Sequence, residues 1–385
     1  MTENSEDQPA RTGEFAAISQ RKKKAGESFM GGPAPVESAR IAVDPDYYPA
    51  PGSFQAELKK AHQVFETFRT CTRQMINDVR VGKPLVIAPI EQPLQAMVES
   101  VIRHPDPMVW MTQLVIPQSF VGGHLLRTSI LSTVLGRGMG LAERQLERLA
   151  WGGLLCQIGK ARLPRQLLEK PGPLEREELD RIREFVAIGV ELAEGVKSLE
   201  PEVVEIIRTH HERADGSGYP QGLNGDQIPV LARLVGVVDW YDTVTSKKPY
   251  TEVVSSSTQA VDALNNKRDI AFSDQVVDEF VRAVGLYPNG SLVELDSGEI
   301  GVVQAQNVMN RTQPRIIIVL DDRHQPLSPQ LKLDLLTYNQ GSKGHPKTIA
   351  KALPDGEYGL NPAEIIERSG ENQSWLSRIT GLGRS

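Results

Sequence analysis

Apolar residues recur at the spacing of an amphipathic helix through most of residues 105–287. The pattern breaks at Gly140-Leu141, at Pro171-Gly172-Pro173 and across residues 213–229, where glycine and proline favour turns. Between these breaks the spacing predicts helices over 124–138, 143–156, 175–195, 201–211, 229–246, 257–265 and 273–284. Such a run of helices predicts an all-α bundle.

The segments on either side of this region have different patterns. Before it, helical spacing over 54–78 and 93–101 predicts a helical lead-in that packs on the main domain. After Gly290 the period becomes that of strands, because residues 291–295 and 300–303 flank an Asp-Ser-Gly hairpin signal. Residues 315–320 are a β-branched run, so a small antiparallel sheet is predicted after the bundle.

Together these patterns predict a mainly α protein with a small C-terminal antiparallel β segment and a disordered N-terminal tail. The tail is rich in Gly, Ser, Pro, Lys and Glu and lacks periodicity, which is typical of disorder. A last, weak helical stretch is predicted over 362–369. The predicted divisions are a tail (1–45), a helical lead-in (46–104), a helical domain (105–288), a β subdomain (289–349) and a C-terminal tail (350–385).

Composition narrows the class of protein. The chain has 385 residues, of which 39% are hydrophobic and 24% charged, as expected for a soluble globular protein. Its net charge of -6 argues against nucleic-acid binding, which needs a concentrated positive face. The two cysteines, Cys71 and Cys156, imply no disulfide framework. The N-terminus is polar and no apolar run reaches transmembrane length. Together with the low cysteine content, these features predict a cytoplasmic protein.

The densest group of chemically active residues is 210–220, which reads His-His-Glu-Arg-Ala-Asp-Gly-Ser-Gly-Tyr-Pro. Its adjacent imidazoles stand where an apolar helix meets a glycine turn, so they can reach a metal or a phosphate. A lone histidine at such a place is most often solvated, whereas the full motif favours a ligand site. The histidines that match no motif are predicted to lie on the surface: His62, His104, His324 and His345.

This motif resembles that of the HD-GYP family, bacterial metal-dependent phosphodiesterases for cyclic di-GMP within the wider HD hydrolases. The resemblance spans about residues 105–287 and also rests on Gly159-Lys160 with Pro164. Residues 238–250 are similar to the family pattern Asp-x-x-Asp-Ala-x-Thr-Ser-x-Arg-Pro-Tyr. The resemblance implies an HD-type helical bundle and a role in bacterial signal transduction.

The family holds two or three metal ions that activate a water for attack on the phosphodiester. Its ligands are a first His, a His-Asp pair, a later His, the His-His of the loop and a final Asp. By resemblance, the retained ligand positions are His124, His210, His211 and Asp239, with Asp242 one turn further along the same helix face.

Three ligand positions carry other residues. The His-Asp pair is replaced by Cys156-Gln157, and the later His falls on Phe185. Gln157 lacks the charge that bridges two dications, and Phe185 has no donor atom. The resemblance therefore implies a degenerate active site, with no cofactor expected.

Cys156 leaves one alternative open. With His, His and Asp it can bind a single divalent ion such as Zn, Mn or Fe. The other interpretation is a small buried hydrophobe, because Cys156 follows an apolar helical stretch.

A bound nucleotide is expected to contact the loop and the residues around it. The predicted ligand-binding residues are Lys160, His210, His211, Arg213, Asp215, Gly216, Gly218, Tyr219 and Pro220. Two interpretations of Lys160 stay open: contact with a phosphate, which makes it the catalytic candidate in an active enzyme, and a solvated helix-end cation. Arg213 and Asp215 are expected to pair. The family uses the Tyr219-Pro220 tip for protein partners, including diguanylate cyclase domains.

The leading hypothesis is a degenerate HD-GYP protein of cyclic di-GMP signalling, catalytically impaired, that acts as a nucleotide receptor or a regulatory interaction protein. One alternative is an active cyclic di-GMP phosphodiesterase with an altered metal site. The other is a protein-interaction module indifferent to nucleotide. The site residues argue against an enzyme, because a missing bridging ligand removes the activated hydroxide.

Overall fold

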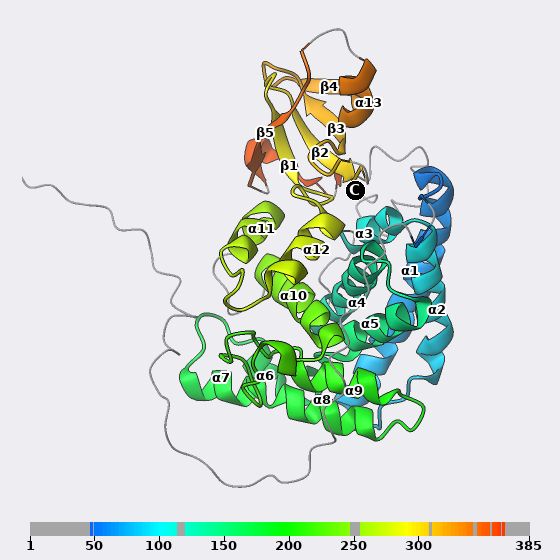
Figure 1. Ribbon diagram of the computed structural model, residues 1–385, viewed down its shortest axis with the longest axis vertical. Helices are drawn as coiled ribbons and strands as arrows, with labels where there is room; N and C mark the ends of the chain where they lie inside the picture. The colour runs from blue at the N-terminus through cyan, green and yellow to red at the C-terminus, as the bar shows by residue number, and fades with distance from the viewer. Residues whose placement is uncertain are drawn as a thin grey trace, which may run out of the picture.

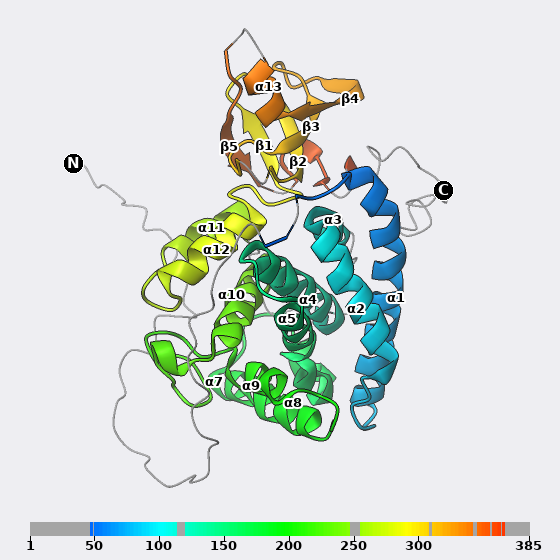
Figure 2. The ribbon, with the colours of Figure 1, turned by 45° about the vertical axis from the view of Figure 1, so that its right-hand side comes forward.

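The computed structural model describes residues 47–48, 50–113, 120–246, 255–307, 310–341, 345–354, 356–362 and 364–365. Figures 1 and 2 show a helical bundle with a small sheet at one end. The predicted class, mainly α with a small C-terminal antiparallel sheet, is confirmed. The predicted disordered tail and most of the weak helix at 362–369 lie outside the described residues.

Most helices of the bundle follow the predicted spacing closely, whereas those at 105–113 and 165–168 were not predicted. Their bounds are α1 (Phe54–Arg80), α2 (Ala88–Arg103), α3 (Pro105–Gln113), α4 (Phe120–Gly138), α5 (Glu143–Leu155), α6 (Arg165–Leu168), α7 (Arg176–Arg183), α8 (Phe185–Glu194), α9 (Pro201–Thr209), α10 (Val230–Thr245), α11 (Ser257–Asn265) and α12 (Asp274–Val284). Short 3-10 helices add η1 (Ile158–Arg162), η2 (Gly225–Gln227) and η3 (Glu357–Gly359).

One stretch that was predicted as a single helix forms two helices in the structure. The stretch 175–195 divides into α7 and α8, which meet at Glu184. There the Glu184 N–H donates to the carbonyl of Arg181, three residues back, at 3.3 Å. A tighter turn of this kind changes which side chains face the core. It places Phe185 at the start of a new helix.

The core of the bundle surrounds α4, which packs against α2, α3, α5, α10 and α12. Leu125, Ile130 and Leu135 of α4 are fully buried, and the helix is buried on most sides, as expected for a central helix. Figure 2 shows α1 and α2 side by side along one flank of the bundle. The lead-in helices thus pack on the main domain, as predicted.

The sheet is antiparallel throughout, in the order β4-β3-β2-β1-β5. Its strands are β1 (Leu292–Leu295), β2 (Ile300–Ala305), β3 (Arg315–Leu320), β4 (Pro326–Asp334) and β5 (Ile349–Leu353). Alternate residues separate its faces, so that Leu292 and Val302 join the bundle core while Val293 and Val303 pack under α13 (Leu335–Gly341). β4 and β5 were not predicted, and β5 spans the boundary drawn at residue 349.

One histidine prediction is wrong. His104 is 7% exposed rather than on the surface, and its ring lies edge-on to Phe54 with centroids 5.8 Å apart. It ends α2 where that helix meets α3, so the local pattern gave no sign of the burial. Within the described parts of the chain, no helix combines the length and apolar character needed to span a bilayer.

Candidate functional site

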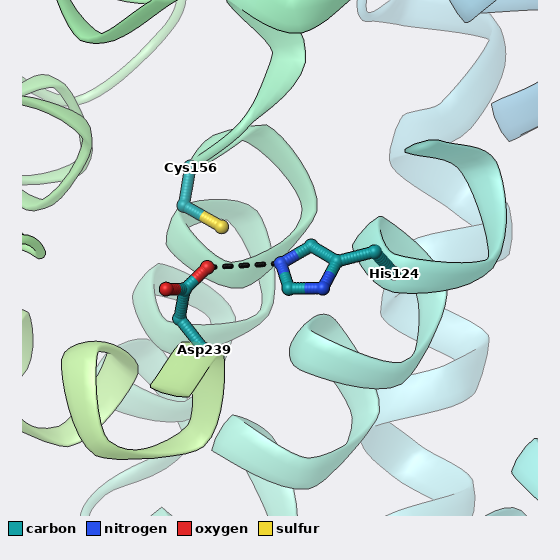
Figure 3. A group of neighbouring side chains, drawn as sticks. All are labelled: His124, Cys156 and Asp239. Carbon is teal, nitrogen blue, oxygen red and sulfur yellow. Dashed lines mark hydrogen bonds and ion pairs between the residues drawn. The ribbon is translucent and has the colours of Figure 1, made fainter. Parts of the chain in front are cut away.

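Two core helices carry the centre of the site. α4 provides His124, and α10 provides Asp239 and Asp242 on one helix face. His124 Nδ1 lies 2.7 Å from Asp242 Oδ2, and His124 Nε2 lies 2.9 Å from Asp239 Oδ1. All three side chains are almost fully buried, and Figure 3 shows the imidazole pointing at Asp239.

The charges in this group compensate one another. Burial lowers the pKa of His124, but its hydrogen bonds to Asp239 and Asp242 outweigh burial and raise the pKa overall. Both ring nitrogens face carboxylate oxygens, so both carry a proton and the ring is an imidazolium. Burial raises the pKa of Asp242, whereas Arg127 and His124 lower it more strongly, to about 2. The two carboxylates therefore share one buried cation.

Arg127 completes the network and was not predicted from the sequence. It lies one turn after His124, donates from Nε to Asp242 Oδ1, and donates from Nη2 to Asp242 Oδ2 at 3.1 Å. A further bond from Nη2 reaches Ser246 Oγ at 2.7 Å. The available signal was the His-x-x-Arg spacing, which places both side chains on one face of a helix.

The substituted positions 156 and 157 lie beside Asp239. Gln157 Nε2 donates to Asp239 Oδ1, and Gln157 Oε1 accepts from Lys160 Nζ. Lys160 is only 7% exposed, so its interpretation as a solvated cation is wrong. Cys156 is fully buried, its thiol donates to the Gly153 carbonyl at 3.2 Å, and burial raises its pKa well above the usual value. It packs as a small protonated hydrophobe.

Gly159 fixes η1 against the start of α8. A Cβ atom at this position would overlap the Phe185 carbonyl, so the two backbones approach as closely as only glycine permits. This contact brings Lys160 and Phe185 together, with Lys160 Nζ 4.8 Å from the Phe185 ring centroid.

Phe185 occupies the site itself. Its side chain is 1% exposed, and its ring centroid lies 5.4 Å from that of His211 and 5.9 Å from that of His210. An apolar ring therefore faces the histidine pair from a position where the resemblance places a metal ligand.

The histidine pair lies at the end of α9. His210 Nδ1 donates to the Ile207 carbonyl at 2.9 Å, which leaves Nε2 as the lone-pair nitrogen. Burial lowers the pKa of His210 to about 4 and that of His211 well below its usual value, so both rings are neutral. His211 Nε2 lies 3.4 Å from Asp239 Oδ2 without hydrogen-bond geometry.

Two groups of side chains have the spacing of metal ligands: His124–Cys156–Asp239 and His210–His211–Asp239, each with ligand atoms within 4.8 Å. The first, drawn in Figure 3, does not fit an ion, because both nitrogens of His124 are engaged and the Cys156 sulfur is protonated. The second fits one divalent ion, because its two Nε2 atoms and Asp239 Oδ2 are buried without a hydrogen-bond partner. A two-ion centre does not fit.

The loop after the histidines is held by Glu212. Its carboxylate, which is 4% exposed, accepts from the backbone N–H groups of Gln221 at 2.7 Å and Leu223 at 3.0 Å. Gly218 packs directly on the backbone of Glu212, where a Cβ atom would overlap it. Glu212 belongs to the motif that was recognised, but this role was not predicted.

Arg213 and Asp215 do not form the expected pair. Arg213 Nη1 donates to the carbonyls of His210 at 3.1 Å and Glu212 at 2.8 Å, and Asp215 Oδ1 accepts from Ser217 Oγ at 2.6 Å. Each side chain therefore forms hydrogen bonds with residues close to it in the sequence. Asp215 and Pro220 are exposed, whereas Gly216, Gly218 and Tyr219 are half-buried.

The comparisons with known proteins agree with this architecture. The HD domain family model matches residues 108–276. "Cyclic di-GMP phosphodiesterase PA4108" of Pseudomonas aeruginosa is 30% identical over 339 residues, which cover 88% of this chain and 77% of that protein.

Two further relatives match shorter parts. "Cyclic di-GMP phosphodiesterase response regulator RpfG" of Xanthomonas campestris is 35% identical over 159 residues, 41% of this chain and 42% of that protein. "3'3'-cGAMP-specific phosphodiesterase 2" of Vibrio cholerae is 35% identical over 132 residues, 34% of this chain and 25% of that protein. The chain thus spans less than half of these two relatives.

Proposed function

This chain belongs to the HD-GYP family, and from that premise we propose that it is a catalytically impaired member that acts in bacterial cyclic di-GMP signalling as a nucleotide receptor or regulatory interaction protein. The observation that carries the proposal is the hydrogen bonding of Asp239, the retained metal-ligand position on α10. One of its oxygens accepts hydrogen bonds from Gln157 and His124 inside a closed network.

The chemistry of the exchanged residues supports impairment. Two-metal hydrolysis needs charged or lone-pair donors that clamp both ions and acidify a bound water. Gln157 is neutral, Phe185 has no donor atom, and the Cys156 thiol keeps its proton. With these three residues at ligand positions, the site lacks the donors that would hold two metal ions, although the helices around it are present.

The proposed nucleotide contacts are those predicted from the sequence. Lys160, His210 and His211 all contact the Phe185 ring, and Tyr219 stacks on His211. An ammonium has three donors, so the bond from Lys160 to Gln157 does not preclude one to phosphate. Arg213, Asp215, Gly216, Gly218 and Pro220 stay predictions, as does the use of the loop tip by a diguanylate cyclase domain or another signalling protein.

Hydrolysis and binding measured on one sample test the proposal. Purified protein with Mn²⁺ or Fe²⁺ should leave cyclic di-GMP intact, while calorimetry detects binding that weakens in Lys160→Ala. Robust hydrolysis that disappears in His210→Ala would sink the proposal. Absence of any binding would leave the nucleotide-independent interaction module in its place.

A second candidate is a phosphodiesterase with a single metal ion. The unpartnered atoms of His210, His211 and Asp239 favour it, since HD phosphohydrolases use divalent metals. An ion held there would polarise a phosphate oxygen. Elemental analysis that finds no ion in purified protein excludes this candidate.

A further inference from the structure

The residues that replace two family ligands both contact one lysine. Gln157 Oε1 accepts from Lys160 Nζ, and the Phe185 ring lies under the same ammonium at 4.8 Å. An amide oxygen and an aromatic face are both groups that attract an ammonium. Neither can replace a carboxylate or an imidazole as a ligand for a divalent metal.

Gln157 also transmits this charge toward Asp239. Its amide accepts from Lys160 on the oxygen side and donates to Asp239 Oδ1 on the nitrogen side. The amide dipole is therefore aligned with its positive end on the carboxylate. An aspartate at position 157 would instead place a second negative charge beside Asp239.

The negative charge of the two buried carboxylates is compensated without an ion. Asp242 faces Arg127 and His124, and Asp239 faces His124 directly and Lys160 through Gln157. Buried carboxylates need such compensation, since an unpaired charge in the interior is strongly unfavourable. Around the two carboxylates stand three cationic side chains: His124, Arg127 and Lys160.

We propose that the Lys160 ammonium, acting through the Gln157 amide, joins the His124 imidazolium as a resident cation on the Oδ1 side of Asp239, in place of a metal ion. The inference rests on the family assignment and not on nucleotide binding. It confines any ion to the His210–His211 side of Asp239. With Cys156, Gln157 and Phe185 in place of the family's ligands, a lysine provides the positive charge that a metal ion would otherwise provide.

Metal stoichiometry tests the placement directly. After dialysis against Mn²⁺, elemental analysis should find at most one ion per chain in the parent protein and none in His210→Ala. Two ions per chain, or an ion that persists in His210→Ala, would overturn the proposal. Since no nucleotide is present, failure of cyclic di-GMP binding leaves this result unaffected.

Variants of Lys160 test the charge. Lys160→Met should lower the melting temperature and strengthen the stabilisation by Mn²⁺, with an affinity at least roughly tenfold tighter than that of the unmodified protein. Lys160→Arg, which keeps a cation, should show the weaker response of the parent. Loss of packing alone would lower the melting temperature without tightening Mn²⁺ binding, and that outcome contradicts the proposal.

The matched control is Lys83→Met. Lys83 also contacts an aspartate, Asp78, at 2.7 Å, but its side chain is 63% exposed. Its removal should change neither the melting temperature nor the Mn²⁺ response. If Lys160→Met does not fold, Lys160→Gln keeps a polar group and makes the same Mn²⁺ prediction.

Discussion

The Tyr219 ring is stacked on the His211 imidazole, with centroids 4.6 Å apart and planes 21° apart. Arg183 lies over the Tyr219 ring at 5.2 Å, and Phe185 meets His211 edge-on at 5.4 Å. A continuous column therefore joins the half-buried loop to the histidine pair. A ligand or partner that moves Tyr219 must also change what surrounds His211.

The first prediction concerns His124 and pH. The folded-state pKa of His124 is raised, so its contribution to stability is complete below the ordinary value of about 6.5 and is lost as pH rises through the raised pKa. Asp242, with a pKa of about 2, contributes above its ordinary value near 3.8 and loses that contribution as pH falls. Both contributions are present between about pH 4 and 6.5.

His124→Gln should therefore cost about 3 kcal/mol at pH 6 and progressively less toward pH 9. Urea unfolding in EDTA measures the free energy of unfolding of the variant and of the parent protein at each pH. The contributions of the other titrating groups largely cancel in the difference between the two. His345→Gln, at an exposed histidine, is the control. A penalty that does not change with pH contradicts the imidazolium assignment.

The second prediction is the recovery of metal chemistry. The triple variant Cys156→His, Gln157→Asp, Phe185→His restores the family ligands, so it should bind at least two ions and hydrolyse cyclic di-GMP at least roughly tenfold faster than the parent. Elemental analysis and product chromatography measure both effects. Adding Asp239→Asn should abolish them. A triple variant that folds yet binds no additional ion would show that other residues cause the impairment.

The third prediction concerns the loop clamp. Glu212→Gln weakens two charge-assisted hydrogen bonds to the backbone, so amide exchange at Gln221 and Leu223 should accelerate by roughly tenfold or more. Hydrogen exchange followed by NMR or mass spectrometry measures the change. Asp226→Asn, at a 96% exposed side chain in the same loop, should leave exchange unchanged. Equal protection in Glu212→Gln and the parent would rule out the clamp.

The fourth prediction concerns the contact between η1 and α8. Gly159→Ala forces a methyl group into the Phe185 carbonyl and should destabilise the fold by about 2 kcal/mol or more. Chemical denaturation provides the measurement. Gly341→Ala introduces a methyl with nothing within 4 Å and should change stability by less than about 0.5 kcal/mol. Similar effects of the two substitutions would contradict the close approach.

Much of the fold followed from local pattern. Most helices between 105 and 287 appeared close to their predicted bounds, because helical periodicity depends on neighbouring residues only, but α3 and α6 were not predicted. The division at Glu184 was missed, since it depends on η1 packing against Phe185. β5 was missed because its partner β1 lies far away in the sequence.

The sequence by itself determined which chemical groups the site has: two histidines before a glycine loop, two aspartates on one helix face, and Cys, Gln and Phe at three ligand positions. Only the tertiary structure decided their pairing. His124 meets Asp242 across 118 residues, and Gln157 meets Asp239 across 82. Such contacts depend on how α4, η1 and α10 pack, and packing over such separations leaves no local periodicity in the chain.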